Sequence, residues 1–292
     1  MTNSIREIIQ RHSRPLSPQP TDTPSRHRSL GAIDTVLFDI YGTLLISGSG
    51  DIGGGDAAAR ATALAEALQA VGVSLRHAPE AALKQWYEVI QGRHRQARES
   101  GVEFPEIDII EVWDEALAGW TSQHWIPATE VDPAVLAVEF EVRANPVWPM
   151  PDMVPTLNRL RQTGRRLGII SNAQFFTLEI FPALVEQTMD RLGFDPDLQF
   201  YSYRYGQAKP GQAMYRMAVD VLRKRGISPE VVLYVVNDMR NDIAPAASCG
   251  FRTALFAGDA RSLRLRPGEP LCDGVKADIV VKELADLLHC LG

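Results

Sequence analysis

Two hydrophobic patterns divide the chain. Between residues 56 and 145 the apolar positions recur with helical spacing, as at Leu64, Leu68 and Val71, so this stretch is predicted to be helical throughout. From Val154 onward, short and continuously apolar runs alternate with helical segments. Such runs are typical of strands buried on both faces of a parallel sheet, and their alternation with helices predicts an α/β unit.

The predicted strands share an apolar, β-branched composition and are too short to be helices of that apolarity. The first of them ends at Asp39 and precedes the helical stretch. The others follow that stretch, at 167–171, 198–203, 231–236, 253–257 and 278–281. A helical segment is therefore predicted to be inserted between the first strand and the rest of the sheet.

Residues 1–30 lie outside this pattern. A capping-box sequence at 4–7 begins a short apolar stripe, whereas 13–30 are rich in Pro, Ser and Thr with almost no apolar periodicity. We expect a short docking helix on an extended tether, outside the catalytic unit. The division expected for the whole chain is an N-terminal arm at 1–30, an α/β core at 31–50 and 146–292, and a helical cap at 51–145.

A glycine-rich stretch joins the first strand to the helical segment. It contains a G-x-G-x-x-G pattern at Gly48, Gly50 and Gly53, which in a dinucleotide-binding fold belongs directly after a strand, inside a compact strand–helix–strand unit. In this chain the pattern starts nine residues after the carboxylate that ends the strand, and more helices follow. A flexible hinge at 47–55, opposite a proline-stiffened return at 145–151, is the better interpretation.

Composition narrows the possible partners. The 292 residues are 45% hydrophobic and 23% charged, with a net charge of −6, which argues against nucleic acid or an anionic membrane as the main partner. The sequence has no long apolar run and no signal-like N-terminus, and its three cysteines lack metal-binding spacing. A cytoplasmic protein is expected. The oligomeric state is not indicated.

Polar side chains able to do chemistry follow several of the predicted strands. The carboxyl ends of parallel strands meet at one edge of a sheet, and ligands bind at that edge in open α/β folds, so these side chains are expected to converge. Each of them alone is a weak signal, but their order along the chain is a strong one. The converging positions are Asp39, Thr43, Ser171, Asn172, Lys209, Asp238 and Asp242.

The sequence resembles the haloacid dehalogenase superfamily of hydrolases. The first two motifs are matched by Asp-Ile-Tyr-Gly-Thr at 39–43 and Ser-Asn at 171–172. The third and fourth are matched by Lys-Pro at 209–210 and Asn-Asp-Met-Arg-Asn-Asp at 237–242. The resemblance covers about 34–292. It implies a Rossmann-like, doubly wound parallel sheet with an inserted all-α cap domain that moves, and an aspartyl-enzyme intermediate.

The resemblance gives these positions roles. Asp39 would attack the substrate and turn one difficult displacement into two easier steps. Thr43, Ser171 and Asn172 would bind the non-reacting oxygens of a phosphoryl group. Lys209 would act as a fixed positive charge beside those oxygens, and a desolvated site makes such a charge effective.

A metal site is expected at the same place. The carboxylates of Asp39, Asp238 and Asp242 would repel one another without a cation. Mg²⁺ fits because it takes few carboxylates, keeps several waters and bridges phosphate oxygens. The family pattern adds the backbone carbonyl of Tyr41 as a ligand.

Two positions depart from the pattern of the superfamily's phosphatases. Most of them carry a second Asp where this chain has Tyr41, and that Asp protonates the leaving group and activates water, which is typically worth ~10²–10⁴-fold. A Tyr is typical of the metal-independent 2-haloacid dehalogenase branch, yet that branch lacks a carboxylate at the position of Asp238. The second departure is Asn237, where a Gly often precedes the Asp.

The function expected from the sequence is that of a Mg²⁺-dependent phosphatase of a small, anionic phosphomonoester. A metal-independent 2-haloacid dehalogenase that works through an aspartyl ester is the alternative, and a weakly active or non-catalytic binding module is a third. The three arginines between 261 and 266 follow a predicted strand and are expected in a solvated loop. Trp86, Trp113 and Trp120 are expected in the core of the helical segment.

Overall fold

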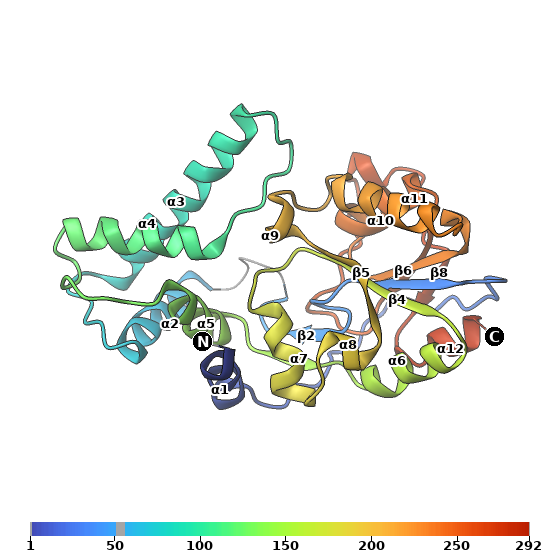
Figure 1. The fold of residues 1–292 in the computed structure, drawn as a ribbon, viewed down its shortest axis with the longest axis horizontal. Coiled ribbons are helices and arrows are strands. Elements are labelled where there is room, and N and C mark those ends of the chain that lie inside the picture. The colour runs from blue at the N-terminus through green and yellow to red at the C-terminus, as the bar shows by residue number, and fades with distance from the viewer. Residues whose placement is uncertain (1, 51–55, 292) are drawn as a thin grey trace.

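A six-stranded parallel sheet forms the centre of the fold (Figure 1). The computed structural model describes residues 2–50 and 56–291. The strands, in their order across the sheet, are β5 (Phe194–Tyr201), β4 (Arg166–Ser171), β1 (Thr35–Phe38), β6 (Val232–Val236), β7 (Arg252–Phe256) and β8 (Ile279–Val281). Because β1 pairs with β4 on one side and with β6 on the other, the loops that follow these three strands lie next to one another.

Helices cover both faces of this sheet. Val36 and Phe38 of β1 belong to one apolar cluster and Leu37 belongs to the other, as the two-residue period of a strand requires. The first cluster includes α6 (Met153–Gln162), α7 (Thr177–Val185), α8 (Met189–Leu192) and α12 (Asp286–Leu291). The second includes α10 (Ala213–Lys224) and α11 (Ala244–Ser248). The predicted doubly wound, Rossmann-like α/β fold is confirmed.

Four helices follow the first strand and form a separate lobe, called the cap from here on (Figure 1). They are α2 (Ala57–Ala70), α3 (Pro79–Glu99), α4 (Ile109–Ser122) and α5 (Pro133–Ala144). Trp113 and Trp120 are fully buried in the cap, and the rings of Trp86 and Trp113 lie 5.2 Å apart. The helical character of this stretch and the core position of its tryptophans are confirmed, whereas the division of the chain into three domains stays a prediction.

The two connections between cap and core are held together by a short ribbon. β2 (Leu45–Ser47) and β3 (Val147–Pro149) pair antiparallel, and the Ser47 hydroxyl donates to Asn145 Oδ1 at 2.8 Å. Gly48 N also donates to Pro146 O at 2.8 Å. Part of the predicted hinge, residues 51–55, lies outside the described residues. The cap therefore leaves and rejoins the core at one point.

The strand predicted at 198–203 is shifted in the structure. β5 begins four residues earlier, at Phe194, and ends before Ser202, where the short helix α9 (Ser202–Tyr205) begins. The early part contains Asp195-Pro196-Asp197, a sequence that favours a turn. β5 is an edge strand, and edge strands tolerate proline and exposed carboxylates. The remaining short helices are Pro229–Val231, Met239–Ile243 and Pro270–Cys272.

The N-terminal arm spans the core and the cap. α1 (Thr2–His12) packs on α7 of the core and on α5 of the cap, with Ile5, Ile8 and Ile9 buried. Arg6 pairs with Glu179 of α7, and His12 Nε2 lies 3.6 Å from a carboxylate oxygen of Glu139 in α5. The predicted docking helix is therefore present, and it connects both lobes (Figure 1).

The extended part of the arm lies along the core. Arg26 pairs with Val280 at the edge strand β8, and Thr21 Oγ1 donates to Ala257 O at 2.6 Å. The predicted tether is therefore fixed to the sheet edge. Among the described residues, no helix combines the length and the apolarity needed to cross a bilayer.

Candidate active site

Asp39 directly follows β1, which pairs with β4 on one side and with β6 on the other. Its backbone N–H donates to Val235 O at 3.1 Å, which continues the pairing with β6. The chain then turns at Gly42, whose φ is +78°. A Cβ at Gly42 would lie 2.5 Å from atoms of Asn237 and Ser262, so both the backbone conformation and the space require glycine. This turn places Thr43 beside the loop that follows β6.

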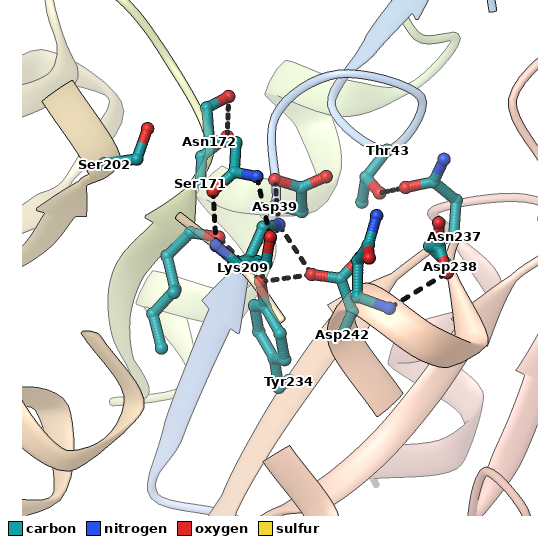
Figure 2. Close-up of polar contacts among 12 residues, drawn as sticks. Asp39, Thr43, Ser171, Asn172, Ser202, Lys209, Tyr234, Asn237, Asp238 and Asp242 are labelled. Carbon is teal, nitrogen blue, oxygen red and sulfur yellow. Dashed lines mark hydrogen bonds and ion pairs between the residues drawn. The ribbon is translucent and has the colours of Figure 1, made fainter. Parts of the chain in front are cut away.

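Lys209 joins two of the predicted carboxylates. Its Nζ lies 2.8 Å from Asp39 Oδ1 and 2.6 Å from Asp242 Oδ1, and it also donates to the hydroxyl of Tyr234 at 3.3 Å (Figure 2). Burial alone would lower the pKa of Lys209, but the carboxylates of Asp242 and Asp39 raise it to about 12. Lys209 is therefore a fixed ammonium beside the oxygen of Asp39.

Asp242 is the most deeply buried of the three carboxylates. Tyr234 OH donates to its Oδ1 at 3.0 Å. Burial raises the pKa of Asp242 to about 7; Lys209 opposes that rise and Asp39 reinforces it. The structure thus places Asp242 as the partner of Lys209, and it adds Tyr234, which was not predicted because it occupies an apolar position of the β6 pattern.

Asp238 has partners of its own. Its Oδ1 accepts from the backbone N–H groups of Arg240 at 2.8 Å and Asn241 at 3.0 Å, which caps the turn that begins at Met239. Its Oδ2 accepts from Arg266 Nη2 at 2.7 Å. Both oxygens of Asp238 are therefore already engaged.

The loop with three arginines was wrongly expected to be solvated. Arg266 is bound to Asp238, Arg264 donates to the carbonyl of Gly50 at 2.9 Å, and Arg261 pairs with the buried Asp259. The backbone of Arg264 also exchanges hydrogen bonds with Asn237 and Met239. These contacts fix the loop against the β6 turn and against the start of the connection to the cap.

The remaining predicted residues lie in the same place (Figure 2). Thr43 Oγ1 donates to Asn237 Oδ1 at 3.3 Å, and Ser171 Oγ donates to Asn172 O at 3.3 Å. Asn172 Oδ1 accepts from the backbone N–H of Lys209 at 2.9 Å. Asn172 therefore positions the lysine loop.

A protein-family model for haloacid dehalogenase-like hydrolases matches residues 33–250, more than half of the chain. The chain belongs to this family. Its members are hydrolases. No curated protein matches the sequence.

Solved structures of similar shape include two kinds of haloacid dehalogenase-like enzyme. A 2-haloacid dehalogenase from Pseudomonas syringae pv. Tomato is 20% identical, with a TM-score of 0.54 over 88% of this chain and 97% of that one. An L-2-haloacid dehalogenase is 24% identical, with a TM-score of 0.50 over 88% and 98%. A predicted phosphoglycolate phosphatase from Haemophilus somnus is 19% identical, with a TM-score of 0.47 over 88% and 97%. At these identities the likeness concerns the fold.

Tyr41 departs from the acid expected in a haloacid dehalogenase-like phosphatase. Its hydroxyl lies 2.9 Å from Thr177 Oγ1, at the start of α7. Burial, reinforced by Glu141 and Asp39, raises the pKa of the phenol. Because its pKa is raised, this phenol is a weaker proton donor at neutral pH than an aspartic acid would be at position 41.

The oxygen donors around Asp39 suit Mg²⁺ in kind, since this ion prefers carboxylate and carbonyl oxygens. Within residues 2–50 and 56–291, however, no three His, Cys, Asp or Glu side chains form a group able to hold a metal ion. Asp242 faces Lys209 and Asp238 faces Arg266. The carboxylates of Asp39 and Asp238, with the carbonyl of Tyr41, would hold Mg²⁺, and Arg266 would compete with the ion for Asp238.

Proposed function

We propose that this haloacid dehalogenase-like hydrolase is a Mg²⁺-dependent phosphatase that cleaves a small phosphomonoester through an aspartyl-phosphate at Asp39. The observation that supports the proposal best is Asp238, a buried carboxylate at the end of β6 beside the buried Asp242. A phosphoryl dianion cannot approach three carboxylates unless cations offset them. Lys209, Arg266 and Mg²⁺ together supply that charge.

The residues around Asp39 have separate tasks in this reaction. The Asp39 carboxylate attacks phosphorus, the ester P–O bond breaks, and water later cleaves the aspartyl-phosphate to release inorganic phosphate. Lys209 and the hydroxyls of Thr43 and Ser171 hold the non-reacting oxygens. Asp39 and Asp238 would hold Mg²⁺, which would offset phosphoryl charge there.

The second candidate is metal-independent attack of Asp39 on carbon, as in a 2-haloacid dehalogenase. One observation favours it: Arg266 already neutralises Asp238 at 2.7 Å without any ion. Tyr41, where the phosphatases carry an aspartate as general acid, also agrees with dehalogenation, because a halide leaves without a proton. In this case Asp238 and Arg266 form a structural pair, and Asp39 attacks the carbon that carries the halogen.

One panel of substrates separates the two candidates. p-Nitrophenyl phosphate, glycerol phosphate and 2-chloropropionate are each incubated with Mg²⁺ and with chelator, using the wild type, Asp39→Asn and Asp238→Ala. The phosphatase proposal expects hydrolysis of p-nitrophenyl phosphate that is lost with chelator and in both variants. Chloride release in chelator without any phosphate hydrolysis would overturn it. Activity on neither class would point to a binding module.

A further inference from the structure

A cavity of about 270 Å³ lies between the cap and the core. Its walls come from all four cap helices and from the core segments that follow Asp39 and Ser171. Most of the wall is aromatic or aliphatic, and the aromatic side chains are Tyr41, Trp86, Tyr87, Trp113, Phe140 and Phe176. On the same side the loop between α3 and α4 returns to the core, where Ala208 N donates to Phe104 O at 2.8 Å.

The charges in this wall offset one another. The guanidinium of Arg60 lies 5.2 Å from the ring centre of Phe140 and 5.7 Å from that of Tyr87. Burial raises the pKa of the neighbouring Glu141, and Arg60 opposes that rise. Glu106 accepts from Ser202 Oγ at 2.6 Å and from Ile107 N at 2.9 Å. The ionisable side chains of the wall are therefore Arg60, His94, Glu106 and Glu141, and the rest of the surface is largely aromatic or aliphatic, which suits an apolar group.

Tyr41 connects this cavity to the nucleophile. It lines the cavity and lies two residues after Asp39 in the same turn. In phosphoryl transfer the attacking and leaving oxygens lie roughly in line with phosphorus between them. Tyr41 therefore brings one wall of the cavity to the turn that carries Asp39.

We propose that the cavity binds the leaving group of the substrate and that this group is a neutral aromatic ring, so that the substrate is an aryl phosphomonoester. This inference rests on the proposed phosphatase function. An apolar cavity of about 150 Å³ is large enough to bind benzene, so the cavity accommodates one substituted ring. The aromatic side chains around it stack with such a ring.

The cleavage of an aryl ester agrees with the presence of Tyr41 at the position where most phosphatases of the superfamily carry an aspartate. The Asp39–phosphorus bond forms while the bond from phosphorus to the aryl oxygen breaks, and the electron pair leaves on a phenolate. A phenol has a pKa of about 10 and water one of about 15.7, so a phenolate leaves unprotonated far more readily than an alkoxide. The phenolate then takes its proton from water.

The first test changes the size of the cavity. Ile90 of α3 lines it, whereas Glu88 of the same helix is exposed and lies outside it. Ile90→Trp is expected to lower kcat/KM for phenyl phosphate at least tenfold more than for acetyl phosphate, which has a good leaving group but no ring. Glu88→Trp introduces the same side chain and is expected to leave that ratio unchanged. An unchanged ratio in Ile90→Trp contradicts the inference.

The second test does not depend on turnover. Phenol is added to the wild type, and tryptophan fluorescence excited at 295 nm reports on the five tryptophans, of which Trp86 and Trp113 lie in the wall. Saturable quenching that is weakened in Ile90→Trp supports the cavity as an aromatic-ring site even if no phosphate is hydrolysed, which separates it from the phosphatase proposal. Phosphate hydrolysis without phenol binding and without preference for aryl esters overturns the inference and leaves the phosphatase intact.

Discussion

Lys209→Met tests the charge balance around Asp39 most directly. In the folded protein the ammonium of Lys209 is buried between the carboxylates of Asp39 and Asp242, at 2.8 and 2.6 Å. Methionine has a similar length but no charge, so the variant leaves two buried carboxylates close together. Removing one partner of a buried ion pair costs about 3–5 kcal/mol, and that loss of unfolding free energy is expected at pH 8 in chelator.

The loss is expected to depend on pH through Asp242. Its pKa is about 7 with Lys209 present, well above the ordinary value, and Lys209 is the group that opposes a further rise. When the pKa of a carboxyl group is higher in the folded than in the unfolded protein, the folded protein loses stability as the pH rises from the unfolded pKa to the folded pKa. Without Lys209 the pH range of this loss extends above pH 7, and the unfolding free energy falls by up to ~1.4 kcal/mol per pH unit within it. The difference from the wild type should therefore be largest above pH 7 and smaller at pH 5.

Urea unfolding followed by circular dichroism at pH 5 and pH 8 measures both effects. Lys224→Met replaces an exposed lysine at the end of α10 and is the matched control, expected within about 0.5 kcal/mol of the wild type. The double variant Lys209→Met/Asp242→Asn should recover part of the loss, because it removes one uncompensated charge. A loss of equal size at both pH values, or no recovery in the double variant, would refute the reasoning.

Four further predictions concern the site and the arm. Asp39→Asn is expected to retain less than about 1% of turnover while circular dichroism still shows a folded protein, because the amide cannot attack. Tyr41→Asp should raise the rate on alkyl phosphates about tenfold more than on aryl phosphates, measured by phosphate release, because only alkoxides need a proton. Arg266→Gln removes the competitor for Asp238 and should lower the Kd for Mg²⁺ about tenfold in isothermal titration calorimetry. Ile9→Ala should lower the unfolding free energy by about 2–5 kcal/mol in urea, since Ile9 is 1% exposed.

The fold was largely predictable because the pattern of buried positions repeats along the chain. Strands buried on both faces have continuously apolar sequences, and the cap helices have apolar residues at helical spacing. Pairings between distant segments were not predictable from such patterns. The β2–β3 ribbon joins Leu45 to Pro149 through strands of three residues, too short to leave a periodic signal. The targets of α1 likewise depend on surfaces that only the folded cap and core provide.

The candidate site was predictable where chemistry coincides with strand ends. Ser171 ends β4, while Asp39 and Asp238 follow β1 and β6 of the same sheet, and parallel pairing alone brings the three to one edge. Tyr234 was missed because a tyrosine inside an apolar strand is indistinguishable from core packing. Arg266 was missed because it lies in a loop without periodicity, where a charge usually faces solvent.

Arg266 changes what Asp238 implies about the metal. From the sequence, a third carboxylate near Asp39 calls for a divalent cation, because uncompensated negative charges repel. In the structure a guanidinium holds one oxygen of Asp238 and two backbone N–H groups hold the other, so the carboxylate is compensated before any ion arrives. The affinity for Mg²⁺ then depends on how much more favourably Asp238 binds the ion than it binds Arg266. The number of carboxylates in the motif does not determine that affinity. Measurement of Mg²⁺ binding in the wild type and in Arg266→Gln therefore tests whether Asp238 binds the ion more directly than the presence of the motif does.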